Sequence, residues 1–295
     1  MTSAPANKVW TTRELLDWMS GAFKTAAIDS PRRSAEELLA HVIGCERMRL
    51  YMDIDRPASP AERDELRGLL RRALAHEPLQ YLIGQWAFFG MPIKCDARAL
   101  IPRPETETLV EHVLQHGRRE DATPLRRIAD ICTGTGCIAL ALAKHLREAE
   151  VVATDVSADA LALAQENAEI LGLSERIDFR EGDLLAPLGE ERFDLITANP
   201  PYISDREWED VEPNVKDHEP TLALRGGGDG LDLVRRLIDR AWERLEAGGW
   251  LVMETASSHA HEARDLCDLS GRYEATGVLD DLAGLPRVVV ARRKA

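Results

Sequence analysis

Apolar residues recur every three or four positions through residues 10–80, the spacing that places them on one face of a helix. Thr11 or Thr12 is a candidate N-cap for the first such segment, because a hydroxyl there can accept a free backbone N–H of the first turn. That segment, TTRELLDWMSGAF (residues 11–23), has apolar side chains along one face, namely Leu15, Leu16, Met19 and Phe23. The pattern predicts an amphipathic helix.

Two further segments repeat this format. In SAEELLAHVIG (residues 34–44), Ser34 is followed three residues later by Glu37, which predicts a capping box, and Gly44 predicts the helix end. SPAERDELRGLLRRALAHEP (residues 59–78) is a third helical segment that stops at a proline. Several short helices with one apolar face each predict a small helical bundle.

The pattern changes in PLQYLIGQWAFFGMPIKCDARALIPRPETETLVEHVL, which begins at Pro78. Aromatic residues, two glycines and partial alternation of apolar and polar positions predict a short hairpin or an extended connector. We place a domain boundary here. Residues 1–84 form an N-terminal helical domain, residues 85–108 a hairpin-type linker, and residues 109–295 a second domain.

From about residue 126 onward, predicted strands alternate with predicted helices. The strands are RRIADIC, EVVATDV, IDFREGD, RFDLITAN and GGWLVMET, and the helix SADALALAQENAEILG has Ser157 as its N-cap. The tail YEATGVLDDLAGLPRVVVARR adds two more strands. Such alternation produces a parallel sheet covered by helices on both faces. The predicted fold class is therefore α/β, with a doubly wound, mostly parallel, seven-stranded Rossmann-like sheet.

The first 80 residues contain 12 basic and 12 acidic residues, so the net charge of −14 comes entirely from the rest of the chain. An acidic body disfavours tight capture of a nucleic-acid backbone, which needs clustered cations. The basic segment GRREDATPLRR (residues 117–127) is interpreted as a solvated loop, so no stable nucleic-acid partner is expected. No apolar run approaches the ~20 residues of a membrane helix, and the N-terminal residues show no signal pattern. We expect a cytoplasmic protein without a membrane partner.

The five cysteines are an odd number scattered along the chain, which favours reduced thiols. Cys132 and Cys137 are close in sequence, but no second Cys or His pair completes a tetrahedral site. No metal is expected.

Two glycines, Gly134 and Gly136, lie between a predicted strand and helix in ADICTGTGCIALAL, where missing side chains let a ligand approach a helix N-terminus. Alone this signal is weak, because the full G-x-G-x-x-G is absent, and a tight turn without a ligand is the alternative. Asp155 ends the next strand, where a carboxylate can accept hydrogen bonds from ribose hydroxyls or cap the following helix. Asp183 follows the third strand and could bind an adenine amino group. Together they predict a nucleoside-bearing cofactor.

The strand RFDLITAN runs into Asn199, Pro200, Pro201 and Tyr202. The prolines fix their own backbone and remove two N–H donors, and Asn199 is pushed into an extended conformation. This acceptor loop (residues 199–202) therefore presents the Asn199 side-chain oxygen and the Pro200 carbonyl beside an aromatic face. A planar –NH2 group, an amide or a base amine, suits such acceptors. Holding its hydrogens makes the nitrogen more electron-rich and aims it at an electrophile.

At these residues the chain resembles S-adenosylmethionine-dependent methyltransferases that act on planar amino groups. The resemblance is most extensive to the protein-glutamine N5-methyltransferases of peptide chain release factors (HemK/PrmC-like). Matching segments follow in that family's order: PLQYLIGQWAFFGMPIKCDARALIPRPETETLVE, DICTGTGCIALALA, NPPYIS, DHEPTLALRGGGDGLDLVRRLI and DDLAGLPRVVVAR. This resemblance implies that a methyl group is transferred from S-adenosylmethionine to the glutamine of the release-factor Gly-Gly-Gln motif, with S-adenosylhomocysteine as product. It also implies an N-terminal domain that recognises this substrate.

The resemblance also implies roles for individual residues. Asp155 would hold the ribose, and Asp183 and Leu184 would lie beside the adenine. The glutamine amide would be held by Asn199, Pro200, Pro201 and Tyr202, of which Asn199, Pro200 and Tyr202 are the expected catalytic residues. Phe89 and residues 102–106 would help to close the site. The full expected cofactor set is Cys132, Thr133, Gly134, Thr135, Gly136, Asp155, Asp183, Leu184 and Asn199. The chain departs from the family at Cys132, where glycine is usual, and at Thr255.

Three alternatives remain at this stage. An N6-adenine methyltransferase shares the acceptor loop but needs a cationic surface to hold nucleic acid. A ribosomal-protein glutamine methyltransferase shares the chemistry with a different protein substrate. A noncatalytic binding module would keep the fold, but the intact acceptor loop and Asp155 disfavour it.

Overall fold

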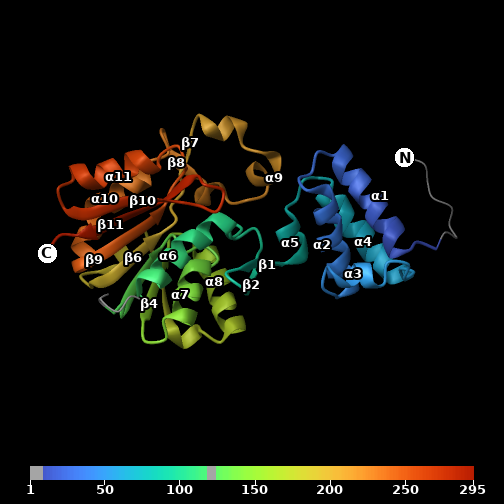
Figure 1. Ribbon diagram of the computed structural model, residues 1–295, viewed down its shortest axis with the longest axis horizontal. Helices are drawn as coiled ribbons and strands as arrows, with labels where there is room; N and C mark the ends of the chain where they lie inside the picture. The colour runs from blue at the N-terminus through green and yellow to red at the C-terminus, as the bar shows by residue number, and fades with distance from the viewer. Residues whose placement is uncertain (1–8, 118–123) are drawn as a thin grey trace. The chain divides into compact units, whose positions relative to one another are not determined.

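The computed structural model describes residues 9–117 and 124–295 (Figure 1). The N-terminal residues inspected for a signal pattern lie largely outside the described residues, as does most of the basic segment 117–127. Two compact units make up the chain. One comprises Met1–Gly84 with Pro213–His218, and the other comprises Gln85–Glu212 with Glu219–Ala295.

The first unit is helical, as the three- and four-residue spacing predicts. Its core contains fully buried side chains from two helices, such as Leu16, Phe23 and Leu38. At the first helix, the Thr11 hydroxyl accepts a hydrogen bond from the Glu14 N–H and the Glu14 carboxylate accepts one from the Thr11 N–H, which forms a capping box. The helices are α1 (Thr12–Thr25), α2 (Pro31–Ile43), α3 (Arg49–Met52), α4 (Pro60–Ala73), α5 (Leu79–Ile83) and α9 (Pro213–Lys216).

The predicted start of the second helix is wrong. Helix α2 begins at Pro31, and Ser34 lies inside the helix, where its hydroxyl donates to the Asp29 carbonyl. Proline is favoured in the first turn because its fixed φ is already helical and its missing N–H would have no intrahelical acceptor. Glu37 forms an ion pair with Arg47 in place of a capping box.

The connector begins with the predicted hairpin. Strands β1 (Gln85–Phe88) and β2 (Met91–Lys94) are antiparallel. Phe89 and Gly90 join them, both at positive φ, as a two-residue hairpin turn requires. The hairpin belongs to the second unit, and it is followed by the 3₁₀ turn η1 (Pro104–Thr106) and helix α6 (Glu107–Gly117).

A seven-stranded sheet forms the centre of the second unit, which confirms the predicted fold class. Its order is β10-β11-β9-β6-β3-β4-β5, with parallel pairing from β9 to β5 and antiparallel pairing of β11 with both neighbours. The strands are β3 (Arg127–Ile131), β4 (Glu150–Asp155), β5 (Ile177–Glu181), β6 (Phe193–Ala198), β9 (Leu245–Glu254), β10 (Tyr273–Asp280) and β11 (Pro286–Arg293).

Helices cover both faces of this sheet. Figure 1 shows α10 (Asp232–Arg244) and α11 (Ala260–Leu269) on one face, and α6, α7 (Cys137–His145) and α8 (Ala158–Leu171) on the other. The chain leaves β3 toward β4 and β5, then returns to β6 on the opposite side of β3. The crevice at the carboxyl ends of β3 and β6 is therefore a topological switch point, where doubly wound sheets bind ligands.

A smaller ribbon lies beyond β6. Strand β7 (Ile203–Ser204) pairs in parallel with β8 (Arg225–Gly227). The short 3₁₀ turns η2 (Ser174–Arg176), η3 (Ala186–Leu188), η4 (Glu207–Asp210) and η5 (Thr221–Ala223) complete the described elements.

Candidate active site

A cavity of about 320 Å³ opens at the carboxyl ends of the parallel strands. Four consecutive parallel strands in the sheet contribute to its lining: Cys132–Thr135 follow β3, Asp155 ends β4, Asp183 follows β5 and Asn199 follows β6. Its volume lies at the lower end of the roughly 300–1,000 Å³ range of small-molecule sites. Residues predicted from four separate segments thus meet in one cavity.

The glycine loop (residues 132–136) is a tight turn between β3 and α7. Cys132, Gly134 and Gly136 all have positive φ, of 59°, 55° and 80°. A side chain on Gly136 would also lie 3.1 Å from the Ala164 Cβ, because α8 packs directly against the loop. The backbone at Cys132 explains why glycine suits that position, since an L side chain is strained at such a φ.

Asp155 connects the glycine loop to the next helix. Its Oδ2 accepts the Gly134 N–H at 2.9 Å, and its Oδ1 accepts the Ser157 N–H at 2.9 Å. Burial raises the pKa of Asp155, and these backbone hydrogen bonds oppose the rise. The carboxylate lines the cavity, so it can hold the loop and still offer lone pairs to a ribose hydroxyl.

Asp130 supports the loop from below, inside β3. It is fully buried, and its two oxygens accept hydroxyl donors from Thr133 at 2.6 Å and Thr197 at 2.7 Å. Burial raises the pKa of Asp130 to about 6. The aspartate therefore ties the cofactor side of the site, at Thr133, to β6, the strand that leads into the acceptor loop.

Asp183 and Leu184 lie at the end of the cavity beside β5. Asp183 forms an ion pair with Arg236, which also lines the cavity. Leu184 has a positive φ of 49°, and its carbonyl accepts the Thr154 hydroxyl at 3.0 Å. The carboxylate predicted to meet an adenine amino group is thus held by an arginine that the sequence did not indicate.

In the acceptor loop, Asn199 and Pro201 line the cavity. The Asn199 Nδ2 donates to the Thr106 Oγ1 at 3.4 Å, and no described residue hydrogen-bonds its Oδ1. Tyr202 points to the end of β9, where its hydroxyl donates to the Glu254 Oε1 at 3.3 Å. Asn199 is thereby oriented with its acceptor atom available.

Two glycines allow another backbone to pack against this loop. A Cβ on Gly226 would lie 2.7 Å from both the Pro201 carbonyl oxygen and the Tyr202 Cα, and a Cβ on Gly230 would lie 2.4 Å from the Tyr202 carbonyl oxygen. Real Cβ atoms do not approach backbone so closely, so only glycine fits at either position. The RGGGDG segment therefore supports the acceptor loop from behind.

Behind the cavity wall, the buried carboxylate of Glu219 holds Ile101 and Arg103, two residues that line the cavity. Glu219 is 5% exposed; its Oε2 accepts the Ile101 N–H at 3.1 Å and its Oε1 pairs with Arg103 at 2.5 Å. This contact holds the predicted closing segment, residues 102–106, beside the cavity. Phe89, predicted to help close the site, instead packs its ring edge-to-face against His145.

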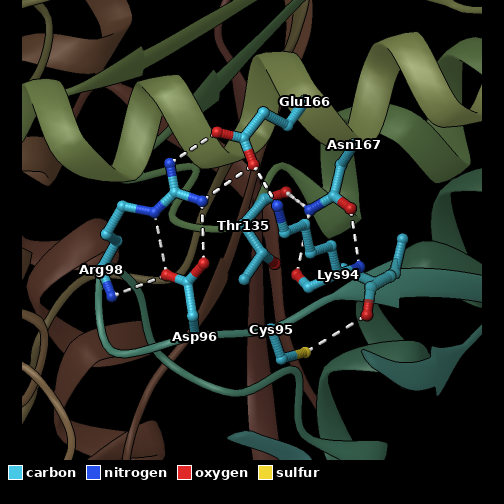
Figure 2. A network of polar contacts seen from close by, with 8 residues as sticks. Lys94, Cys95, Asp96, Arg98, Thr135, Glu166 and Asn167 are labelled. Carbon is cyan, nitrogen blue, oxygen red and sulfur yellow. Dashed lines mark hydrogen bonds and ion pairs between the residues drawn. The ribbon is translucent and has the colours of Figure 1, made fainter. Parts of the chain in front are cut away.

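A cluster of polar contacts joins the hairpin to α8 and to the glycine loop (Figure 2). The buried side chain of Asn167 accepts the Lys94 N–H at 2.7 Å and donates to the Lys94 carbonyl at 3.2 Å and the Thr135 carbonyl at 3.0 Å. On the surface, Glu166 pairs with Lys94 and Arg98. One asparagine thus fixes the position of β2 relative to the cofactor side of the site.

Within the described ranges, no group of three or more His, Cys, Asp or Glu side chains is placed to hold a metal ion. None of the helices in the described part of the chain is long and apolar enough to cross a membrane.

Comparison with known proteins identifies the two units. Residues 14–84 match the family model described as PrmC N-terminal domain, and residues 104–216 match the Methyltransferase small domain. Among solved structures, a methyltransferase from Pyrococcus furiosus has a TM-score of 0.53 and 17% identity, covering 79% of this chain and 99% of that one. The delta-N METTL16 MTase domain has a TM-score of 0.51 and 24% identity, covering 70% and 90%. These two likenesses establish the fold.

Similarity along the whole chain establishes more than the fold. The release factor glutamine methyltransferase of Geobacter sulfurreducens is 40% identical, with 99% of each chain covered. The enzymes of that name from Chlorobaculum tepidum and Xylella fastidiosa are 39% and 41% identical, covering 96% and 92% of this chain and 97% of each of theirs. The chain therefore belongs to the release factor glutamine methyltransferase family.

Proposed function

We propose that the protein methylates the side-chain amide nitrogen of the glutamine in the Gly-Gly-Gln motif of peptide chain release factors, and so modulates translation termination. S-adenosylmethionine is the methyl donor. One observation carries the proposal: Asn199 lies at the cofactor cavity with its amide nitrogen held by Thr106 and its oxygen available. That arrangement fits an acceptor for an amide –NH2 group beside a nucleoside-bearing cofactor.

The residues that would hold S-adenosylmethionine fit its parts. The glycine loop leaves room for the methionine part, Asp155 offers carboxylate oxygens to the ribose, and Asp183 with Leu184 borders the adenine end. When bound, this cofactor supplies an electrophilic methyl group on a sulfonium and leaves as S-adenosylhomocysteine.

The chain's own contribution is positioning and electrostatics. The Asn199 Oδ1 and the Pro200 carbonyl accept the two hydrogens of the substrate amide, which directs its nitrogen at the methyl group. With the cofactor bound, the amide nitrogen would form a bond to the methyl carbon as the sulfur–carbon bond breaks, the bonding electrons would stay on the sulfur of S-adenosylhomocysteine, and the nitrogen would lose one proton to water. Tyr202, predicted as catalytic, does not line the cavity, and its hydroxyl anchors the end of the acceptor loop to Glu254.

The charge distribution supports a protein substrate. The net charge of −14 disfavours stable binding to a nucleic-acid backbone. We propose that the helical unit, residues 1–84, takes part in recognising the release factor. A release-factor substrate also implies that the enzyme works where translation occurs, in the cytoplasm.

Mass spectrometry of a purified release factor, after incubation with the protein and S-adenosylmethionine, tests the proposal. We expect one added methyl group on the Gly-Gly-Gln peptide and none on a substrate with that glutamine changed to alanine. Calorimetry with S-adenosylmethionine checks cofactor binding separately. Cofactor binding without methylation of this peptide would overturn the substrate assignment, and a ribosomal-protein glutamine and a nucleic-acid amine would then be assayed.

A further inference from the structure

Glu254 is a buried acidic residue that the chemistry described above does not use. It ends β9 and is fully buried. Strands β6 and β9 are parallel, with Ala198 opposite Met253, so the next residues, Asn199 and Glu254, emerge side by side at the same edge of the sheet. The carboxyl group therefore lies directly beside the beginning of the acceptor loop.

The carboxyl group of Glu254 accepts a hydrogen bond from one end of that loop and faces Thr106, which binds the other end. At the far end, the Tyr202 hydroxyl donates to its Oε1 at 3.3 Å. At the near end, the Thr106 hydroxyl favours the charged form of the carboxyl, and the same hydroxyl oxygen accepts the Asn199 Nδ2. The second oxygen, Oε2, is buried and has no hydrogen-bond partner among the described residues.

The groups around this carboxyl group have opposite effects on its pKa. Burial raises the pKa of Glu254 to about 7, with Glu105 adding to the rise, while Thr106, Arg287 and Tyr202 counteract it. A buried carboxyl group is stable in its neutral form, whereas the two hydroxyl donors are satisfied best by a carboxylate. The groups that face the carboxyl are Glu105 and Thr106 from η1, Tyr202 from the acceptor loop, Arg287 from β11 and Cys137 from α7.

We propose that Glu254 is a positioning residue whose carboxylate, through Tyr202 and Thr106, holds both ends of the acceptor loop in the geometry that receives the substrate amide. Protonation of the carboxyl group at Oε2 removes its negative charge and so weakens the hydrogen bond that Oε1 accepts from Tyr202. Turnover then rises with pH as the carboxylate forms, while cofactor binding, which relies mainly on residues that follow β3, β4 and β5, changes little. This inference rests on the proposed function for its kinetic part only.

The kinetic test compares wild type with Glu254→Gln, which resembles the neutral acid at every pH. In wild type, kcat for release-factor methylation is expected to rise between pH 6 and pH 8. In the variant, kcat should stay at a low plateau, about tenfold below wild type at pH 8, the order of loss caused by a small misplacement of a reacting group. The KM and the calorimetric Kd for S-adenosylmethionine should stay unchanged. A variant with the wild-type pH profile, or with equally weakened cofactor binding, overturns the proposal.

A second measurement does not depend on the substrate. Amide hydrogen exchange of a peptide covering residues 199–206 is followed in wild type, Glu254→Met and Glu254→Gln. The methionine variant cannot accept the Tyr202 hydroxyl, so exchange should be about fivefold faster, the factor expected for one lost hydrogen bond. The glutamine variant should fall between the two.

The matched control is Asp194→Asn at the other end of β6, where the carboxylate accepts the N–H groups of Arg126 and Arg127. It should leave exchange in residues 199–206 unchanged. Unchanged exchange in Glu254→Met would overturn the positioning role even if methylation is observed. Faster exchange in a protein that does not methylate release factors would uphold that role and reject the proposed substrate.

Discussion

Asn199 has two amide atoms with different surroundings. Its nitrogen donates to Thr106, its oxygen has no hydrogen-bond partner among the described residues, and the residue lines the cavity. Asn199→Ala removes the oxygen proposed to receive the substrate amide, so kcat should fall by about 10²- to 10³-fold, as for loss of one preorganised electrostatic contact. In the proposed site the cofactor is held mainly by the other strand ends, so its Kd should change less than about threefold. Single-turnover methylation and calorimetry measure the two quantities, and equal losses in both would make Asn199 chiefly a cofactor residue.

Gly136 combines a positive φ with close packing. Gly136→Ala adds a strained backbone and a Cβ 3.1 Å from the Ala164 Cβ. We expect a loss of about 2 kcal/mol or more in unfolding free energy, with weaker cofactor binding, because strain and overpacking add. Gly172→Ala is the matched control: its φ is +67°, and nothing lies within 4 Å of the added Cβ. It should cost about 1 kcal/mol from backbone strain alone. Thermal unfolding and calorimetry distinguish the two, and equal losses would show that packing against α8 is unimportant.

A site residue could be predicted from the sequence when its role depends only on neighbouring residues in the chain. The prolines and Asn199 act through their own backbone and side chain, and so they are recognisable in a short stretch of sequence. Thr106 is different, because its partner Asn199 is 93 residues away. Asp130 and Glu254 are single acids in or at the end of apolar strands, and their roles depend on donors contributed by other elements. No local pattern carries that information.

Helix α8 and the hairpin are joined through Asn167, whose side chain satisfies one buried and two partly buried backbone groups (Figure 2). Asn167→Ala leaves the Lys94 N–H and the Lys94 and Thr135 carbonyls without these partners. We expect a loss of about 3 kcal/mol or more in unfolding free energy, since each unsatisfied buried group costs roughly 1–3 kcal/mol. Weaker cofactor binding should follow, because Thr135 belongs to the glycine loop. Denaturant unfolding and calorimetry provide the measurements.

The neighbouring residue on the same helix supplies the control. Glu166→Gln removes the surface ion pairs with Lys94 and Arg98 and leaves Asn167 in place. Exposed pairs are screened by solvent, so this variant should be far less destabilised than Asn167→Ala. If both variants lose the same stability, the hairpin is held by the surface charges and the role given to Asn167 is wrong.

The strands of the main sheet are predictable because each is a short apolar run bounded by polar residues or glycine. The start of α2 is not, because Ser30-Pro31 and Ser34 with Glu37 are competing start signals four residues apart. The β7–β8 ribbon is also missed: its strands are two and three residues long and pair across about twenty residues of loop. Their close approach to the acceptor loop is visible only as glycines in RGGGDG, whose packing partners the sequence does not name.

Among the described residues of the second unit, two carboxyl groups with raised pKa values are fully buried: Asp130, at about 6, and Glu254, at about 7. A raised folded-state pKa means that the folded chain binds the proton more tightly than the unfolded chain. The stability from Glu254 is therefore complete below pH ~4.5 and is lost as the pH rises through ~7. Carboxylates with lowered pKa values, such as Glu62, lose their contribution only at more acidic pH.

Glu254→Gln removes this pH dependence, because glutamine is neutral throughout. The variant should therefore gain stability relative to wild type as the pH rises. The difference in unfolding free energy, variant minus wild type, should increase by about 3 kcal/mol between pH 4.5 and pH 8, at 1.36 kcal/mol per pKa unit. Denaturant unfolding at the two pH values, with Asp194→Asn as control, measures the change. A constant difference between variant and wild type would mean that Glu254 is not protonated near neutral pH. At pH 8, Glu254→Gln should therefore be more stable than wild type and turn over more slowly. Both effects have one cause, because burial destabilises the negative charge of Glu254 and the proposed positioning of the acceptor loop requires that charge.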